Sequence, residues 1–117
     1  MNQELRQKLQ DTADEIVRIL AEKDDAYGSS WKSRGGFSAF FQLDRKWSRL
    51  EQMAEGSKYD IFMAILDYQD GPDTLKDLIG YALLILSETY EPPRNASHLD
   101  HGGEPGRDYV NQDGEGR

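Results

Sequence analysis

The sequence contains no cysteine in its 117 residues and only two histidines. The absence of cysteine excludes disulfide bonds and thiol chemistry, and it is typical of a reducing compartment. No apolar run approaches the roughly 18 residues that a membrane-spanning helix needs. The N-terminus is polar and lacks the apolar centre of a secretion signal. These absences predict a cytoplasmic protein that is not inserted in a membrane.

Apolar residues are also scarce, at 37%, while charged residues reach 31%. A chain of this length can bury one modest core, so part of it is expected to lie outside. The net charge is −8, from 22 acidic and 14 basic residues. Such a field repels a nucleic-acid backbone, so direct binding to a duplex is not expected. Binding of a small phosphate ligand is not excluded, because a few local cations suffice to hold it.

Apolar residues recur at helical spacing in four segments, and no segment shows the alternation of a strand. The spacing predicts helices at 3–27, from about Ser38 to 56, at 59–69, and from Pro72 or Asp73 to about Tyr90. We therefore predict an all-α bundle of three long helices and one short helix, formed by residues 1–90. Residues 91–117 are rich in glycine and poor in aliphatic side chains, which predicts a flexible tail.

Two of these helices have distinctive apolar faces. A narrow stripe on the second helix predicts a helix-packing seam, formed by Phe40, Leu43, Trp47, Leu50 and Ala54. The last helix is apolar nearly all round at 81–87, so it should be central or lie at a subunit interface. We therefore expect a homo-oligomer, a dimer or larger, joined through the helix that contains 81–87. Gly80 is a poor helix former and is expected where another group approaches the backbone closely.

The loop between the first two helices combines aromatic and cationic side chains. Tyr27 and Trp31 could stack on a base, and Lys32 and Arg34 could contact phosphates near the start of the next helix. The alternative is that Trp31 covers the core and that the cations are solvated. The nucleotide-binding candidates are the loop residues Tyr27, Trp31, Lys32 and Arg34, together with Arg45 and Arg49 on the outer face of the second helix.

Four carboxylates lie on two predicted helix faces. Asp44 and Glu51 are two turns apart on the second helix, and Asp73 and Asp77 are four residues apart on the last. If the two faces meet, the four side chains converge into the kind of hard oxygen site that Mg²⁺ prefers. The alternative is that Asp73 is an ordinary N-cap and that Asp44 and Glu51 are solvated or paired with Arg45 and Lys46.

The strings KDDAYGSSW, GGFSAFFQLDRKWSRLE, YDIFMAI and DTLKDLIGYALLIL resemble small phage and prophage proteins of the nucleotide-modification-associated domain family. That family is similar to the MazG-like all-α nucleoside triphosphate pyrophosphohydrolases. The resemblance spans about residues 20–90 and implies a dimeric or larger helical bundle. It also implies a Mg²⁺-dependent cut between the α and β phosphates. By position, the metal ligands would be Asp44, Glu51, Asp73 and Asp77, with Asp44, Glu51 and Asp77 in catalytic roles.

Three hypotheses follow. The first is a phage nucleoside triphosphate pyrophosphohydrolase, active in nucleotide metabolism or DNA modification in the cytoplasm of a bacterial host. There Lys32, Arg34 and Arg49 would neutralise charge that develops on the phosphates. The second is a non-catalytic binder that sequesters a linear or cyclic nucleotide, or an accessory subunit, because neither acidic pair has the family's i, i+3 spacing. The third is a structural or partner-binding protein, which the apolar run at 81–87 favours.

Overall fold

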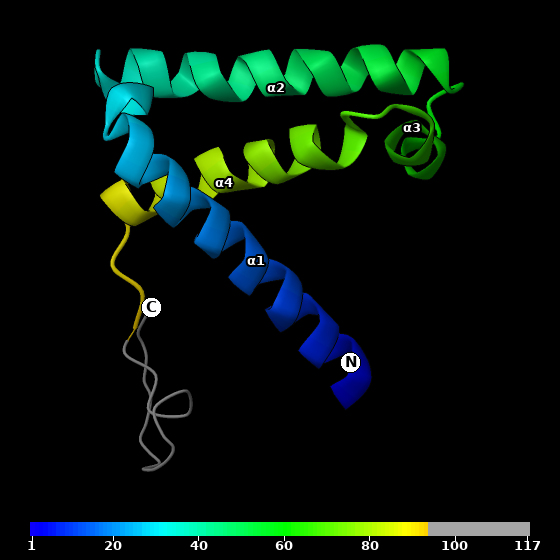
Figure 1. Cartoon of the computed structure of the whole chain (residues 1–117), viewed down its shortest axis with the longest axis horizontal. Helices are drawn as coiled ribbons and strands as arrows, with labels where there is room; N and C mark the ends of the chain where they lie inside the picture. The colour runs from blue at the N-terminus through cyan, green and yellow to red at the C-terminus, as the bar shows by residue number, and fades with distance from the viewer. Residues whose placement is uncertain (94–117) are drawn as a thin grey trace.

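The computed structural model describes residues 1–93 of the chain. Within this range the elements are α1 (Gln3–Tyr27), the 3₁₀ turn η1 (Ser30–Lys32), α2 (Gly36–Gly56), α3 (Ile61–Asp67) and α4 (Gly71–Thr89). The predicted all-α class is confirmed, with three long helices and one short helix (Figure 1). The tail that we predicted at 91–117 lies, beyond residue 93, outside the described residues.

Local capping explains where the first two helices begin and end. The Asn2 side chain accepts the Leu5 N–H at 2.8 Å and starts α1, and Gly28 ends it with a φ of 64°. α2 begins two residues before the predicted N-cap Ser38, because Gly35 takes a φ of 66° and provides the break. The Ser38 hydroxyl lies inside the first turn instead, where it accepts the Arg34 N–H.

The short helix α3 is narrower than the predicted range of 59–69. Lys58 and Tyr59 both have positive φ, at 56° and 64°, so the helix cannot extend through them. Asp60 then caps α3 by accepting the N–H groups of Phe62 and Met63. The backbone thus turns sharply between α2 and α3, which sets α3 against α2 and α4.

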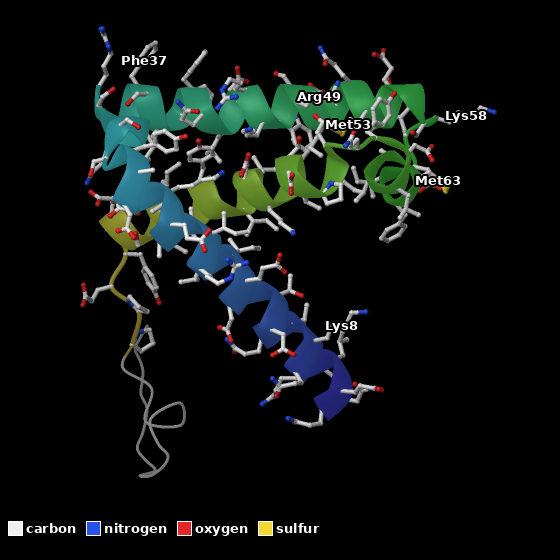
Figure 2. All side chains as sticks on the ribbon, viewed as in Figure 1. Lys8, Phe37, Arg49, Met53, Lys58 and Met63 are labelled. Carbon is white, nitrogen blue, oxygen red and sulfur yellow. The ribbon has the colours of Figure 1, made fainter. Side chains whose placement is uncertain are left out.

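The apolar core lies where α2, α3 and α4 meet. Leu50, Met53 and Ala64 are buried, with side chains from α3 and α4 packed around them, namely Ile65, Tyr68, Leu75 and Leu78. Figure 2 shows Met53 on the side of α2 that faces α4, and Phe37 on the opposite side. The turn into α4 is equally tight, since a Cβ on Gly71 would lie 2.6 Å from the Ile65 carbonyl oxygen.

The predicted packing seam of α2 is only partly correct. Leu50 is buried, but Phe40 and Trp47 are 65% and 53% exposed. α4 meets α2 along the face that carries Ala39, Lys46, Leu50 and Met53, about 100° around the helix from the two aromatics. The larger aromatic side chains therefore point outward, and the smaller or flexible ones form the intramolecular contact.

α1 crosses α4 with its C-terminal half, and its N-terminal half extends away from the other helices (Figure 1). A Cβ on Gly80 would lie 3.0 Å from Leu20 Cδ2, so the predicted close approach at Gly80 is confirmed and Leu20 makes it. Ile16 is the buried residue of α1. Among residues 1–93, no helix combines the length and apolarity that crossing a bilayer requires.

Candidate functional site

A pocket of about 110 Å³ opens where α1, η1 and α4 meet. This volume is well above the 10–15 Å³ or so that one water molecule needs. Its lining comes from all three elements: Ile16, Ile19, Leu20, Lys23, Asp24 and Tyr27 from α1, Gly28, Ser30 and Trp31 around η1, and Lys76, Asp77, Tyr81 and Leu84 from α4. Ile16 is buried and Tyr27 is largely exposed, so the pocket runs from the core to solvent.

Asp77 lies between two lysines from two other helices. Its carboxylate oxygens are 2.8 Å from Lys23 Nζ of α1 and 2.8 Å from Lys46 Nζ of α2. Partial burial raises the pKa of Asp77, but the hydrogen bonds from Lys23 and Lys46 outweigh it and leave the pKa below its ordinary value. One carboxylate thus faces two ammonium groups, and Asp24 is the other acidic side chain of the pocket lining.

Further ion pairs surround the pocket. Lys76 is 2.8 Å from Glu15 of α1, and the hydrogen bond between them lowers the pKa of Glu15 and raises that of Lys76. Lys32 is 2.8 Å from Glu88 and lies 5.7 Å from the centre of the Trp31 ring. These pairs join α1 and η1 to α4, and each is partly exposed, so solvent screening keeps their contribution to stability small.

The loop residues that we predicted to bind a nucleotide divide into two groups. Tyr27 and Trp31 line the pocket. Lys32 lies beside the pocket and forms an ion pair with Glu88. Arg34 is exposed and does not line the pocket. The two predicted aromatics are therefore brought together, while the two predicted phosphate contacts are not.

The arginines of α2 lie away from the pocket. Arg45 donates to the Gln42 side chain at 2.7 Å. Arg49 donates twice to Asp70, at 2.9 and 3.0 Å, and lies 5.4 Å from the centre of the Tyr68 ring. The prediction that Arg49 lies on an outer face is wrong, because this bidentate contact connects α2 to the start of α4.

The four predicted metal ligands are not gathered in the single chain. Asp44 is two residues from Lys46, about 200° around α2, so it points away from the α4 face that Lys46 contacts. Asp73 lies in the first turn of α4, and Asp70, not Asp73, is the N-cap. In the described part of the chain, no three acidic or histidine side chains form a group that could hold a metal ion. Mg²⁺ binding stays a prediction.

Sequence reasoning missed Lys23, Lys76 and Tyr81, which line the same pocket as Tyr27 and Trp31. A signal was present, because Lys23 lies four residues before Tyr27 and Tyr81 lies four after Asp77, so each shares a helix face with a candidate. The prediction considered the loop apart from the helices that flank it. The helix crossing at Gly80 then decides which side chains meet the loop.

Comparison of the chain with protein-family models, with curated proteins and with solved structures finds no match.

Proposed function

We propose that this protein binds a nucleotide in the pocket between α1, η1 and α4. The observation that carries the proposal is the pocket lining. It combines three aromatic side chains with two lysines, namely Tyr27, Trp31, Tyr81, Lys23 and Lys76. An aromatic ring can stack on a base with about 1–3 kcal/mol per base. An ammonium group is a compact charge that binds phosphate oxygens. The pocket thus offers partners for both ends of a nucleotide.

The lysine contacts of Asp77 offer a cation for an anionic ligand. Lys23 and Lys46 share this one carboxylate, so one of them can turn to a phosphate while the other keeps its partner, and Asp24 is the second acidic side chain of the lining. The Lys23 side chain is 48% exposed and the Lys46 side chain 18%, so Lys23 is the one that can turn toward a phosphate. Local cations of this kind attract a small anion despite the overall negative field.

Binding without turnover is the form of the proposal that the pocket supports best. Its carboxylate Asp77 already accepts contacts from two lysines and would have to lose them to act as a base or metal ligand. Pyrophosphohydrolase activity stays a separate proposal, which rests on the sequence resemblance. For that activity, more than one copy of the chain would have to contribute carboxylates, so that Asp44, Glu51 and Asp73 surround Asp77.

Calorimetry with linear and cyclic nucleotides, with and without Mg²⁺, tests the binding proposal. We expect binding without Mg²⁺, and we expect Trp31→Ala to weaken it about 5- to 150-fold, which corresponds to the loss of one stacked base. Trp47→Ala is the matched control, since Trp47 lies on the outer face of α2 and its loss should change the Kd less than twofold. Absence of any nucleotide binding, or an equal loss in both variants, would reject the proposal.

A pyrophosphate-release assay on the same nucleotides separates binding from catalysis. Sequestration predicts that no pyrophosphate is released with Mg²⁺ present. Turnover that Asp77→Ala abolishes, while Trp47→Ala leaves it intact, would instead establish the pyrophosphohydrolase.

We also infer that the protein self-associates through α4. Ile79, Leu83 and Leu86 are exposed on one side of this helix, and residues 78–87 include no charged side chain. An exposed apolar face of this kind marks a contact surface. Sedimentation should show a dimer or larger species, and Leu83→Lys should shift it toward the monomer. A wild-type protein that sediments as a monomer at high concentration would reject this inference.

A further inference from the structure

Within residues 1–93, the N-terminal half of α1 packs against no other helix. Every residue from 1 to 15 is exposed, and the segment extends into solvent away from α2, α3 and α4, where Lys8 marks it in Figure 2. We call residues 3–14 the α1 arm. The arm continues the 25-residue helix α1, so the packed half nucleates it, and the face of the arm is left free to contact another molecule.

The arm carries an apolar seam in register with the packed half of α1. Leu5 precedes Ile16 by 11 residues and Leu9 precedes Leu20 by 11, so each pair lies within about 20° on the helix surface. Ile16 is buried, and Leu20 meets Gly80 of α4. The same seam that packs on α4 within the chain therefore continues along the arm, where Leu5 and Leu9 are 45% and 50% exposed.

α4 presents a matching surface. We call Ile79, Leu83 and Leu86 the α4 strip, and all three side chains are exposed. The strip runs about 10 Å along the helix, so it is long enough to receive Leu5 and Leu9 of the arm, which lie about 6 Å apart along α1. The run 78–87 has no charge, so two copies of net charge −8 can approach there without bringing carboxylates together.

We propose that the α1 arm of one copy packs along the α4 strip of a second copy, and that the exchange is reciprocal about a twofold axis. The proposal rests on the self-association through α4 inferred above and names the segment that covers the strip. A twofold interface is the commonest closed arrangement, and it uses each copy's arm and each copy's strip once. Two such helix contacts also bring the buried area toward the roughly 1,600 Å² of a stable interface, twice what a single contact supplies.

Sedimentation of surface variants tests the arm. The double substitution Leu5→Lys and Leu9→Lys should shift the oligomer toward the monomer by at least tenfold in dissociation constant, as should Leu83→Lys. Val17→Lys is the matched control, because Val17 is exposed on α1 about 120° from Leu5 and should leave the oligomer intact. Circular dichroism confirms that each variant remains folded.

The outcomes separate the two inferences. A monomeric wild type overturns both. An oligomer that Leu83→Lys dissociates and the arm variant does not leaves the self-association standing and overturns the role of the arm. Equal dissociation by Val17→Lys overturns it too.

Cross-linking identifies the partner segment directly, because the chain has no cysteine of its own. Single-cysteine variants Leu9→Cys and Leu83→Cys, one with a longer tag, are mixed and treated with a short bismaleimide. The proposal predicts a hetero-linked pair of intermediate mass, since one cysteine lies on the arm of one copy and the other on the strip of its partner. Exclusive Leu83→Cys homo-links, exclusive Leu9→Cys homo-links, or no links at all would overturn it.

Discussion

The junction of α2, α3 and α4 and the crossing of α1 over α4 are built from different interactions. At the junction, Met53 and Ala64 are fully buried among apolar neighbours from three helices. At the crossing, Ile16 is the buried residue of α1, and two ion pairs connect the helices, Lys23 with Asp77 and Glu15 with Lys76.

The two regions are held with different strength, because buried apolar contacts and exposed ion pairs contribute different free energies. A fully buried aliphatic side chain contributes about 1.5–3 kcal/mol, whereas an exposed ion pair contributes at most about 1 kcal/mol. The junction should therefore hold the fold together. The crossing is held more weakly, and the pocket lies there, next to ionic groups that a ligand can rearrange.

The largest expected effect comes from the junction. Met53→Ala removes a fully buried side chain and should lower the free energy of unfolding by about 2–5 kcal/mol, measured by urea denaturation. Val17→Ala, at an exposed position of α1, should change it by less than about 0.5 kcal/mol. Similar losses in the two variants would remove the distinction between the regions.

The tight turn into α4 should be the next most sensitive position. Gly71→Ala would place a Cβ 2.6 Å from a backbone oxygen of Ile65, so we expect a loss of about 1–3 kcal/mol. Gly36→Ala is the matched control, because a Cβ there would meet nothing within 4 Å. Thermal unfolding of both variants checks this, and a stable Gly71→Ala protein would contradict the observed packing.

Asp77 should make stability at the crossing depend on pH. Its pKa is below the ordinary value of 3.8, so its stabilising contribution is present above about pH 4 and is lost as the pH falls through the lowered pKa. Asp77→Asn should cost about 1–2 kcal/mol at pH 7, and the difference from wild type should shrink below pH 4.

Thermal unfolding across that pH range measures the effect of Asp77. Asp44→Asn serves as the control, since Asp44 is exposed on α2. A difference between Asp77→Asn and wild type that stays constant down to pH 2 would show that the two lysines do not act through the ionised carboxylate.

The smallest effect should come from the turn between α2 and α3. Lys58 has a φ of 56°, where a side chain is strained, so Lys58→Gly should raise the free energy of unfolding by about 0.5 kcal/mol. Lys8→Gly, in the N-terminal part of α1, should lower it by up to about 1 kcal/mol. Changes of the same sign in both variants would contradict the assigned backbone conformations.

Much of the fold could be predicted from local signals. The range of α1 agrees with the prediction, because apolar spacing defines its length and Asn2 and Gly28 act on the turns next to them. The start of α2 was misplaced, since Ser38 and Gly35 both carry start signals and only the backbone of Gly35 takes the positive φ. The helix starts after the residue that takes the positive φ, and glycine adopts that conformation more readily than serine.

The packed face of α2 could not be predicted in the same way. Two apolar stripes run along this helix, one with Phe40 and Trp47 and one with Ala39 and Met53, and periodicity alone does not rank them. The aromatic stripe is larger, yet the smaller side chains face α4 because α4 packs close to α2 there. The shapes of the side chains between α2 and α4 therefore determine which stripe is buried.

The sequence by itself determined the helices, the breaks between them and the aromatic loop, because caps, glycine breaks and apolar spacing act over a few residues. Only the tertiary structure decided that Asp77 meets Lys23 and Lys46, that Tyr27 and Trp31 meet Lys76 and Tyr81, and that Arg49 joins Asp70. These contacts depend on how the helices cross, and the crossing is set by close packing at Gly80 and around Met53. The spacing of residues along one helix does not determine the angle at which two helices cross.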